Sequence, residues 1–316
     1  MYLAECYGKG GIYAKMVADS ISKTGIRIST LELNYHRFIH SEFMTHRMFS
    51  RNASSSRAIP VNKILEKLKE NPAMPIYWGK NKAGMQADEE LDVLIFTDPE
   101  CSGISREDLW KDAAEMAGYF AKDFSKTGYH KQIVNRLTEP FQFIRVIVTA
   151  TEWDNFFKLR LHPAAQPEIQ ELARSMKIAM DSSIPEKLSV GEYHLPYIDK
   201  KEFNCFNKHP KMNAWNGSIE EPIKASIARC ARVSYLNHDK SKPDVKKDIE
   251  LYNHLLKEGH MSPFEHIATP IDEIQMNGLL HGVHPDNWDL GTTHVDKNDV
   301  PWSGNFKGWI QYRQLL

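Results

Sequence analysis

Residues 26–57 read IRISTLELNYHRFIHSEFMTHRMFSRNASSSR, and this stretch sets the first expectations for the fold. Apolar and polar residues alternate over 26–35, which predicts a β-strand. Over residues 36–48 apolar side chains recur at helical spacing, so a helix is expected after the strand. Residues 50–57 are almost entirely polar, which indicates a turn.

Several later segments also have helical patterns. Ser105 and Asp108 have the spacing of a capping box, and the apolar stripe that follows, ending at Gly128, predicts a helix. Residues 133–160 continue with helical or buried character. Further helices are expected over 168–180, 221–235, 245–259 and 305–316, a strand over Ile267–Ile274, and loops over 185–220 and 281–304. No linker separates these segments, so one domain over residues 1–316 is expected.

The composition is that of a soluble globular protein. Of the 316 residues, 41% are hydrophobic and 26% charged, and no apolar run reaches the length of a membrane helix. The net charge of −1 argues against a general nucleic-acid binder. The N-terminus, MYLAECYGKGG, lacks the pattern of a signal peptide. The four cysteines, Cys6, Cys101, Cys205 and Cys230, are scattered, so we expect a reducing, cytoplasmic location without a disulfide framework or zinc finger.

The polar turn is the first candidate for chemistry. Residues 45–57 contain three arginines, one histidine and four serines. Guanidinium groups and hydroxyls are the groups that bind phosphate or pyrophosphate. Composition alone favours a solvated surface turn, so the segment needs support from other parts of the chain.

Two further segments combine apolar and polar residues. Residues 155–160, NFFKLR, read as core-facing Phe156, Phe157 and Leu159 followed by Arg160, and a charge in that place is usually a surface arginine with a buried stem. The third segment comprises the sequences RVS at 232–234 and HMSPFEH at 260–266. Taken alone, it could be a helix cap and a packed turn.

Together the three segments resemble the signatures of the flavin-dependent thymidylate synthases. Residues 45–57 are similar to the pattern RHRxxSxNxxSxR and depart at the first position, where Thr45 replaces arginine. Residues 155–160 resemble NFxxLR, and the third segment resembles RVS with HxTPFEH, where Ser262 replaces threonine. The first pattern is matched at His46, Arg47, Ser50, Asn52, Ser55 and Arg57. RVS and PFEH come last in this chain but first in the family, so the chain is expected to be circularly permuted.

The resemblance implies a reaction and an assembly. The family moves a one-carbon unit from 5,10-methylenetetrahydrofolate to C5 of dUMP, giving dTMP, with electrons passing from NADPH through FAD. It also implies a homotetramer with an α+β fold, in which a mixed or antiparallel sheet and long helices replace a Rossmann fold. Arg160 is the expected catalytic residue, because a protonated guanidinium could stabilise negative charge at the polar edge of the pyrimidine ring.

The same resemblance assigns the residues that contact ligands. Those expected at the nucleotide are Glu42, Ser54, Ser55, Ser56, Arg57, Gln132, Arg160 and Ser234. Those expected at FAD are Thr45, His46, Arg47, Asn52, Asn155, His260, Ser262 and Glu265.

Three positions depart from the family and leave the substrate open. Thr45 and Ala53 stand where the family has arginine and often glutamate, and Gln132 stands near the place of a nucleotide-binding arginine. Arg160 could donate to the N3 lone pair of cytosine as well as to uracil. Flavin-dependent hydroxymethylation of a nucleotide such as dCMP is therefore the closest alternative.

Two alternative functions belong to other classes of protein. The arginine- and serine-rich turn and the aromatic residues, 10% of the chain, would also suit a non-catalytic nucleotide- or RNA-binding module. His36 and His40, with His281 and His284, would suit a metal-dependent hydrolase. No carboxylate pattern completes a metal site, so we expect none.

Overall fold

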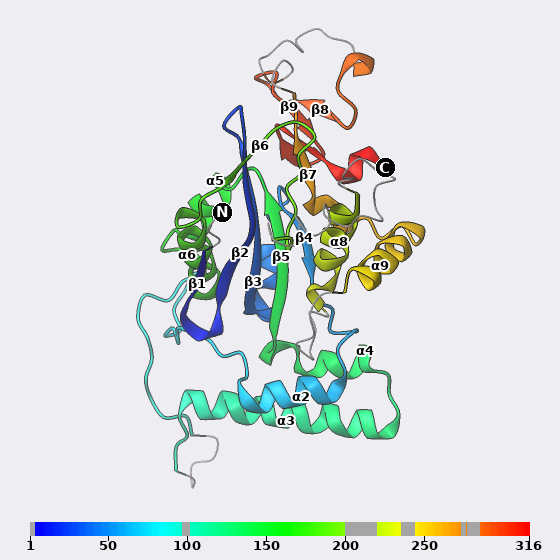
Figure 1. Cartoon of the computed structure of the whole chain (residues 1–316). Helices are drawn as coiled ribbons and strands as arrows, with labels where there is room; N and C mark the ends of the chain where they lie inside the picture. Colours follow the sequence, from blue (N-terminus) through cyan, green and yellow to red (C-terminus); the bar gives the residue numbers. More distant parts are fainter. Residues whose placement is uncertain (1–3, 97–101, 200–219, 235–243, 273–275, 277–284) are drawn as a thin grey trace.

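A six-stranded sheet lies at the centre of the computed structural model, which describes residues 4–96, 102–199, 220–234, 244–272, 276 and 285–316 (Figure 1). The strand order is β1-β2-β3-β5-β4, and β6 pairs with β2 in parallel while the other neighbours are antiparallel. The strands are β1 (Glu5–Tyr7), β2 (Tyr13–Ser22), β3 (Arg27–His36), β4 (Ser50–Ala53), β5 (Phe143–Ala150) and β6 (Glu186–Leu188). This α+β arrangement with a mixed sheet agrees with the expected fold class.

The central strands are buried on both faces. The strand expected over 26–35 is confirmed as β3, in which nearly every residue is buried. β5 falls inside residues 133–160, where we expected helical or buried character. A short apolar run between two packed layers has no alternation, so its periodicity does not distinguish a strand from a helix.

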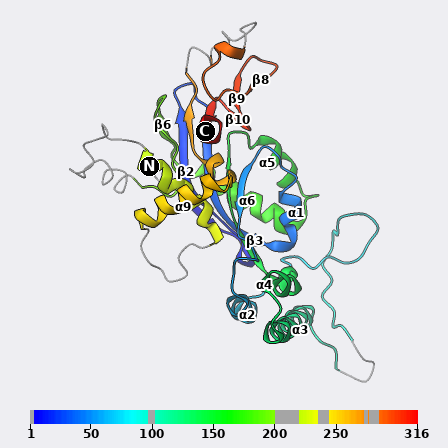
Figure 2. The ribbon, with the colours of Figure 1, turned by 90° about the vertical axis from the view of Figure 1, so that its right-hand side faces the viewer.

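Helices cover both faces of the sheet (Figure 2). On one face lie α5 (Asp154–Arg160) and α6 (Pro167–Asp181), and on the other lie α8 (Glu220–Ala231) and α9 (Val245–Lys257). Pro167 occupies the first turn of α6, where its missing N–H costs nothing. The helices expected over 168–180, 221–235 and 245–259 are confirmed by α6, α8 and α9.

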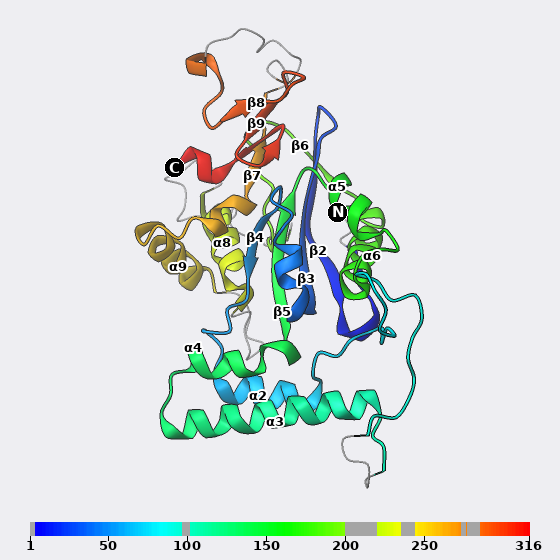
Figure 3. The ribbon, with the colours of Figure 1, turned by 180° about the vertical axis from the view of Figure 1, so that it is seen from behind.

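A third group of helices crosses the end of the sheet at which β5 begins (Figure 3). It consists of α2 (Val61–Glu70), α3 (Arg106–Thr127), α4 (Lys131–Val134) and the 3₁₀ helix η3 (Asn135–Phe141). The helix expected from Ser105 to Gly128 is confirmed: the Ser105 hydroxyl accepts from the Asp108 N–H, and Gly128 ends α3 with φ 102°. Its apolar stripe, however, is exposed, since Ala114 and Ala121 are the buried residues of α3.

Two expected helices are wrong. Over 36–48 the structure has only the 3₁₀ helix η2 (Arg37–Ile39) and α1 (His40–Phe43), because the chain then turns through short backbone hydrogen bonds such as His46 N to Phe43 O. The segment 305–316 is mostly extended, and the 3₁₀ helix η8 (Tyr312–Leu315) is confined to its end. Gly308, with φ 68°, places a turn between two short strands there.

The C-terminal strands form two small sheets beside the central one. β11 (Trp309–Gln311) pairs with β7 (Ala268–Pro270), which lies within the expected strand 267–274. The other small sheet contains β8 (His294–Val295), β9 (Pro301–Ser303) and β10 (Phe306–Lys307), although loops were expected over most of this region. Among the described helices, none has the length and hydropathy of a membrane span.

Candidate functional site

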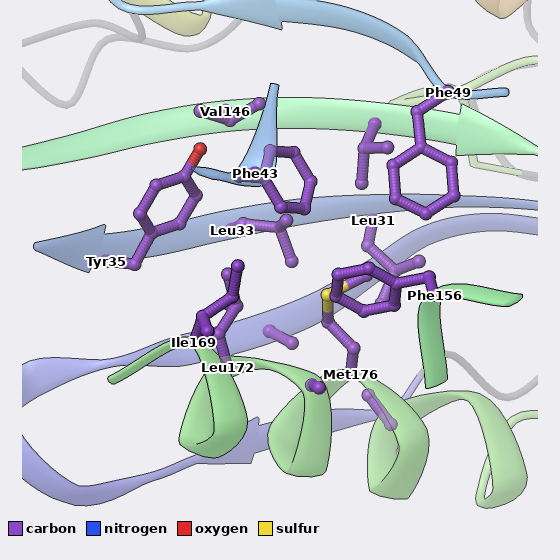
Figure 4. Close-up of a cluster of buried hydrophobic side chains, with 14 of the residues drawn as sticks. Leu31, Leu33, Tyr35, Phe43, Phe49, Val146, Phe156, Ile169, Leu172 and Met176 are labelled. Carbon is purple, nitrogen blue, oxygen red and sulfur yellow. The ribbon is translucent and has the colours of Figure 1, made fainter. Parts of the chain in front are cut away.

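An aromatic cluster joins the first two signature segments. Phe49 and Phe156 are buried in the core between the sheet and α6 (Figure 4), with ring centroids 5.3 Å apart. Trp153 lies 4.7 Å from Phe49, and the His46 ring meets the edge of Phe156 at 4.9 Å. Offset and edge-to-face contacts of this kind add stability beyond the burial of the rings. The cluster therefore fixes α5 against the turn that begins at Thr45.

Arg160 ends α5 and its side chain is held from three sides. The Nε atom donates to His46 Nε2 at 2.9 Å, and Nη1 forms an ion pair with the Glu42 carboxylate. The Nη2 atom lies 3.4 Å from Thr45 Oγ1. With a side chain only 16% exposed, Arg160 is not a surface arginine. A guanidinium has five N–H donors, so donors remain for a ligand.

His46 is a neutral acceptor beside these cations. Burial, followed by the charges of Arg160 and Arg51, lowers the pKa of His46 to about 4. Because Nε2 accepts from Arg160, the single proton of the neutral ring is assigned to Nδ1. Arg51 in turn donates to the carbonyl oxygens of Met44 and His46 at 3.0 and 3.1 Å, which fixes the turn around the histidine.

Arg160, His46 and Thr45 lie in the wall of a cavity of about 160 Å³, here called the Arg160 cavity. Its lining consists of Thr45, His46, Arg47, Met48, Phe49, Glu152, Asn155, Phe156, Leu159 and Arg160. Thr45, His46, Arg47 and Asn155, all predicted at the cofactor, thus lie together with Arg160. Leu159 is 50% exposed, which corrects the expectation that it faces the core. The cavity is smaller than the roughly 300 Å³ at which pockets for whole small molecules begin, so it suits one part of a larger ligand.

The third segment lies beside the first. Its last five residues form the 3₁₀ helix η6 (Ser262–His266), which packs against β4. The buried Gln311 amide joins them, because Nε2 is 3.1 Å from both Ser50 Oγ and the Glu265 carbonyl. The Glu265 carboxylate forms an ion pair with Arg313. His260 and Ser262 are exposed at the start of this segment.

Asn52 offers a donor in the same region. Its Nδ2 atom is buried and has no hydrogen-bond partner among the described residues. Asn52 and Ser50 are two apart on β4, so they face the same side of the strand, toward η6. An unpaired buried donor costs free energy unless a ligand or water satisfies it.

A buried chain of hydroxyls and imidazoles anchors η6 to the sheet. His194 contacts Ser20 Oγ through Nδ1 at 2.9 Å and Thr30 Oγ1 through Nε2 at 2.7 Å. Thr30 Oγ1 contacts Thr149 Oγ1 at 2.7 Å, and Thr149 Oγ1 contacts His266 Nδ1 at 2.8 Å. Burial lowers the pKa of both histidines to about 3, so both are neutral.

The serine-rich end of the first segment, residues 54–57, lies outside the Arg160 cavity. The Ser54 hydroxyl accepts from the Arg145 N–H at 3.1 Å, and the buried Ser56 hydroxyl donates to Glu139 at 3.0 Å. The Ser55 hydroxyl accepts from the Arg57 N–H at 3.3 Å, and the Arg57 side chain is exposed. The four predicted nucleotide residues of this end, Ser54, Ser55, Ser56 and Arg57, do not line the Arg160 cavity of this chain.

Gln132, also predicted at the nucleotide, is an exposed residue of α4. The helix lies against the serine-rich turn, because Lys131 Nζ donates to the Ala58 carbonyl at 3.0 Å and Asn135 Nδ2 to the Ser56 carbonyl at 2.7 Å. Gln132 therefore lies near that turn rather than in the Arg160 cavity.

Ser234 belongs to the 3₁₀ helix η5 (Arg232–Ser234), and its side chain lies outside the described residues. The preceding Arg232 is held by Asp248, with Nη1 2.6 Å from the carboxylate.

The proposed metal ligands fall partly outside the described structure. His281 and His284 lie in the segment that is not described. His40 Nδ1 contacts the Tyr35 hydroxyl at 2.8 Å, and His36 is fully buried between the rings of Phe38 and Phe143. Within the described ranges no three His, Cys, Asp or Glu residues gather as a metal site.

Several residues of this region were not singled out from the sequence. Gln311, His194 and Thr149 lie far from the signature segments in the chain and join them only through the fold. The aromatic and β-branched residues next to Gly308 were the available signal that Gln311 lies in a strand.

No protein-family model and no curated protein matches the chain. Among solved structures, the chain is similar to a UMP/dUMP methylase, PolB from Streptomyces cacaoi, bound with 5-Br UMP. The identity is 16%, the match covers 54% of this chain and 89% of that one, and the TM-score is 0.39. A similarity at this level does not establish a shared activity.

The buried histidines predict a stability that falls in acid. His194 has a native pKa of about 3 against an ordinary value of 6.5, so between these values the unfolded chain binds a proton that the folded chain does not. Stability therefore decreases as the pH falls through this window. His194→Gln should reduce the slope of the unfolding free energy against pH by about 1.4 kcal/mol per pH unit, measured by urea unfolding at several pH values in the window. An unchanged slope would show that His194 does not titrate in this way.

Proposed function

We propose that this protein is a flavin-dependent enzyme that transfers a one-carbon unit from 5,10-methylenetetrahydrofolate to C5 of a pyrimidine deoxynucleotide, dUMP in the first instance. One observation carries the proposal: Arg160 donates to His46, 114 positions away, inside a cavity built from the first two signature segments. The third segment packs beside the first through η6. The resemblance assigned all three to one site, although their order in the chain is different.

The residues present fit a flavin. Thr45, Arg47 and Asn155 line the cavity with hydroxyl, guanidinium and amide groups, and the amide donor of Asn52 is unpaired and buried nearby. The ring edge of a flavin presents carbonyl oxygens and ring nitrogens, and its phosphates are anionic, so donors and cations of this kind suit it. A bound flavin would supply electron transfer from NADPH, and Thr45, Arg47, Asn52 and Asn155 would hold and orient it.

Arg160 is proposed to act on the pyrimidine. Its contacts with Glu42 and His46 fix the guanidinium plane, and the surrounding aromatic rings exclude water from one side. A preorganised donor of this kind stabilises negative charge on the ring as C5 becomes nucleophilic. Because His46 is neutral, it adds no positive charge that would compete with Arg160 for the negative charge on the pyrimidine ring. Neither Cys6 nor Cys230 lines the cavity, so neither is placed to attack the ring.

The assembly is proposed to be a homotetramer. The Arg160 cavity is small, and the predicted nucleotide residues Ser55, Arg57 and Gln132 lie outside it, so a second copy of the chain would have to complete the site. Exposed apolar side chains suitable for burial between copies gather on α3 and the residues after it. They are Met116, Tyr119, Phe120, Phe124, Tyr129, Ile133 and Leu137, each between 39% and 59% exposed.

The reaction is tested by the mass of the product. Purified protein is incubated with FAD, NADPH, 5,10-methylenetetrahydrofolate and either dUMP or dCMP, and the nucleotide is analysed by mass spectrometry. We expect dUMP to gain CH₂. A gain of CH₂O on dCMP would instead assign the hydroxymethylating alternative. A folded protein that binds FAD yet leaves both nucleotides unchanged would refute the one-carbon transfer.

Substitution of Arg160 separates catalysis from binding. Arg160→Ala should lower turnover by about a hundredfold to a thousandfold, because loss of one preorganised donor costs about 2.7–4 kcal/mol. Arg160→Lys should recover little, since an ammonium cannot copy the planar fork that reaches His46 and Glu42. Turnover is measured together with the flavin absorbance spectrum.

Lys158→Ala is the matched control, because Lys158 lies on the same helix and is exposed. Its turnover should equal that of the wild type. Near wild-type turnover in Arg160→Ala with flavin bound would show that Arg160 is only structural.

A further inference from the structure

A second cavity, of about 260 Å³, lies at the opposite end of β5 from the Arg160 cavity. It is formed where the start of β5, Asn34 near the end of β3 and Gly11 before β2 meet α2, at the end of the sheet that α2 and α3 cross in Figure 3. The two cavities share no lining residue. Arg145 lines one and Glu152 the other, and at about 3.3 Å per residue they are roughly 20 Å apart along the chain.

Two cations face this cavity, here called the Lys67 cavity. Lys67 comes from α2 and Arg145 from β5, and neither forms an ion pair with a carboxylate of the described residues. Both cations are exposed to solvent, and partial burial, followed by the charges of Arg145 and Lys63, lowers the pKa of Lys67. One carboxylate, Glu70, also lines the cavity, so the cations outnumber the anion. Like charges gathered without partners create a positive potential that favours an anion.

The backbone beside Arg145 is rigid. Ser54 N donates to the Arg145 carbonyl at 2.8 Å, and the Arg145 N–H donates to Ser54 Oγ at 3.1 Å. Asn34, the cross-strand neighbour of Arg145, donates to the Gly11 carbonyl at 2.8 Å. The backbone that carries the guanidinium is therefore fixed without a ligand, which reduces the entropy lost on binding.

The rest of the lining combines an apolar wall with the polar side chains of Asn34, Ser54, Asn71 and Gln142. Phe143 is half-buried and its ring is held against His36 at a centroid distance of 5.0 Å. The other apolar residues of the lining are Ile59, Ile64, Leu68, Phe141 and Val233. Apolar walls with a few convergent polar groups are typical of small-molecule sites. The volume suits one ring system with one charged group rather than a dinucleotide.

We propose that the Lys67 cavity binds a small organic phosphate with an aromatic body, of the size of a nucleoside monophosphate, at a site separate from the Arg160 cavity. The phosphate lies between Lys67 and Arg145, and the ring packs on the apolar wall that includes Phe143. The two cavities are too far apart for one mononucleotide to reach both. Ser54, which the resemblance assigns to the nucleotide, also lines this cavity, whereas no residue of the Arg160 cavity does.

Isothermal titration with UMP, AMP, uridine and inorganic phosphate tests the chemistry of the ligand. At least one of the two nucleotides should bind more tightly than uridine, which has no phosphate, and more tightly than phosphate, which has no ring. Uridine binding as tightly as UMP would overturn the role of the phosphate. Phosphate binding as tightly as both nucleotides would overturn the role of the ring. Absence of nucleotide binding at millimolar concentration would overturn the site.

Charge variants of opposite sign test the location. Lys67→Gln and Arg145→Gln should each weaken nucleotide binding about tenfold, because each removes a charged hydrogen bond. Glu70→Gln should strengthen it, because it removes the one carboxylate of the lining. Circular dichroism confirms that each variant is folded.

Two controls separate this site from the proposed active site. Lys69→Gln, on the same helix but outside the lining, should bind as the wild type does. In Arg160→Ala, which removes a donor of the proposed active site, the nucleotide binding that depends on Lys67 and Arg145 should remain. If Arg160→Ala abolishes nucleotide binding while Lys67→Gln and Arg145→Gln do not affect it, the nucleotide binds only in the Arg160 cavity and the second site is refuted.

Discussion

The packing of Phe156 against Phe49 and His46 is the contact on which the candidate site depends. These rings come from segments more than a hundred residues apart, and their burial between the sheet and α6 sets the position of α5 relative to the turn at Thr45. Arg160 follows Phe156 by one helical turn, so it reaches the edge of this cluster. The core therefore places the guanidinium, and the contacts to His46 and Glu42 orient it.

The opposite face of the sheet positions the third segment by a different interaction. The chain from Ser20 through His194 and Thr149 to His266 is hydrogen-bonded within the core, and each neutral imidazole can donate at one nitrogen and accept at the other. Both nitrogens of His194 are paired, whereas His266 Nε2 has no hydrogen-bond partner among the described residues, so the network fixes His194 more completely than His266. The apolar face of η6, with Phe264 fully buried, adds to this anchoring. The first and third signature segments are thus held from opposite faces of one sheet, and they lie next to each other at β4.

Secondary-structure elements that carry a clear local sequence signal were predicted correctly. The capping box at Ser105, Pro167 in the first turn of α6 and the alternation along β3 are each read from a few neighbouring residues, and all three elements form. β2 was missed because its buried positions include the polar residues Asp19, Ser20 and Ser22, so its sequence has no regular alternation of apolar and polar residues. The apolar stripe of α3 predicted a helix correctly but not its surroundings, since Phe120 remains exposed in the single chain.

The candidate site could be predicted only in part, because its contacts depend on which elements meet in the fold. The resemblance named the segments, but the partners of those segments come from elsewhere in the fold. Gln311 and His194 carry no local mark of their role, because burial and neighbours in space define it. Lys67 and Arg145 likewise meet only because α2 crosses the end of β5. Periodicity reports which face of an element is apolar, and it does not report which elements meet.

Backbone hydrogen exchange with and without FAD tests the central claim most directly, that three segments distant in the sequence form one flavin site. Amides of a bound site exchange more slowly because ligand binding stabilises the closed state. We predict that FAD slows exchange in residues 45–52, 155–160 and 260–266 together, while α2 is unaffected. Protection confined to one of these segments, or found only elsewhere in the chain, would contradict the account.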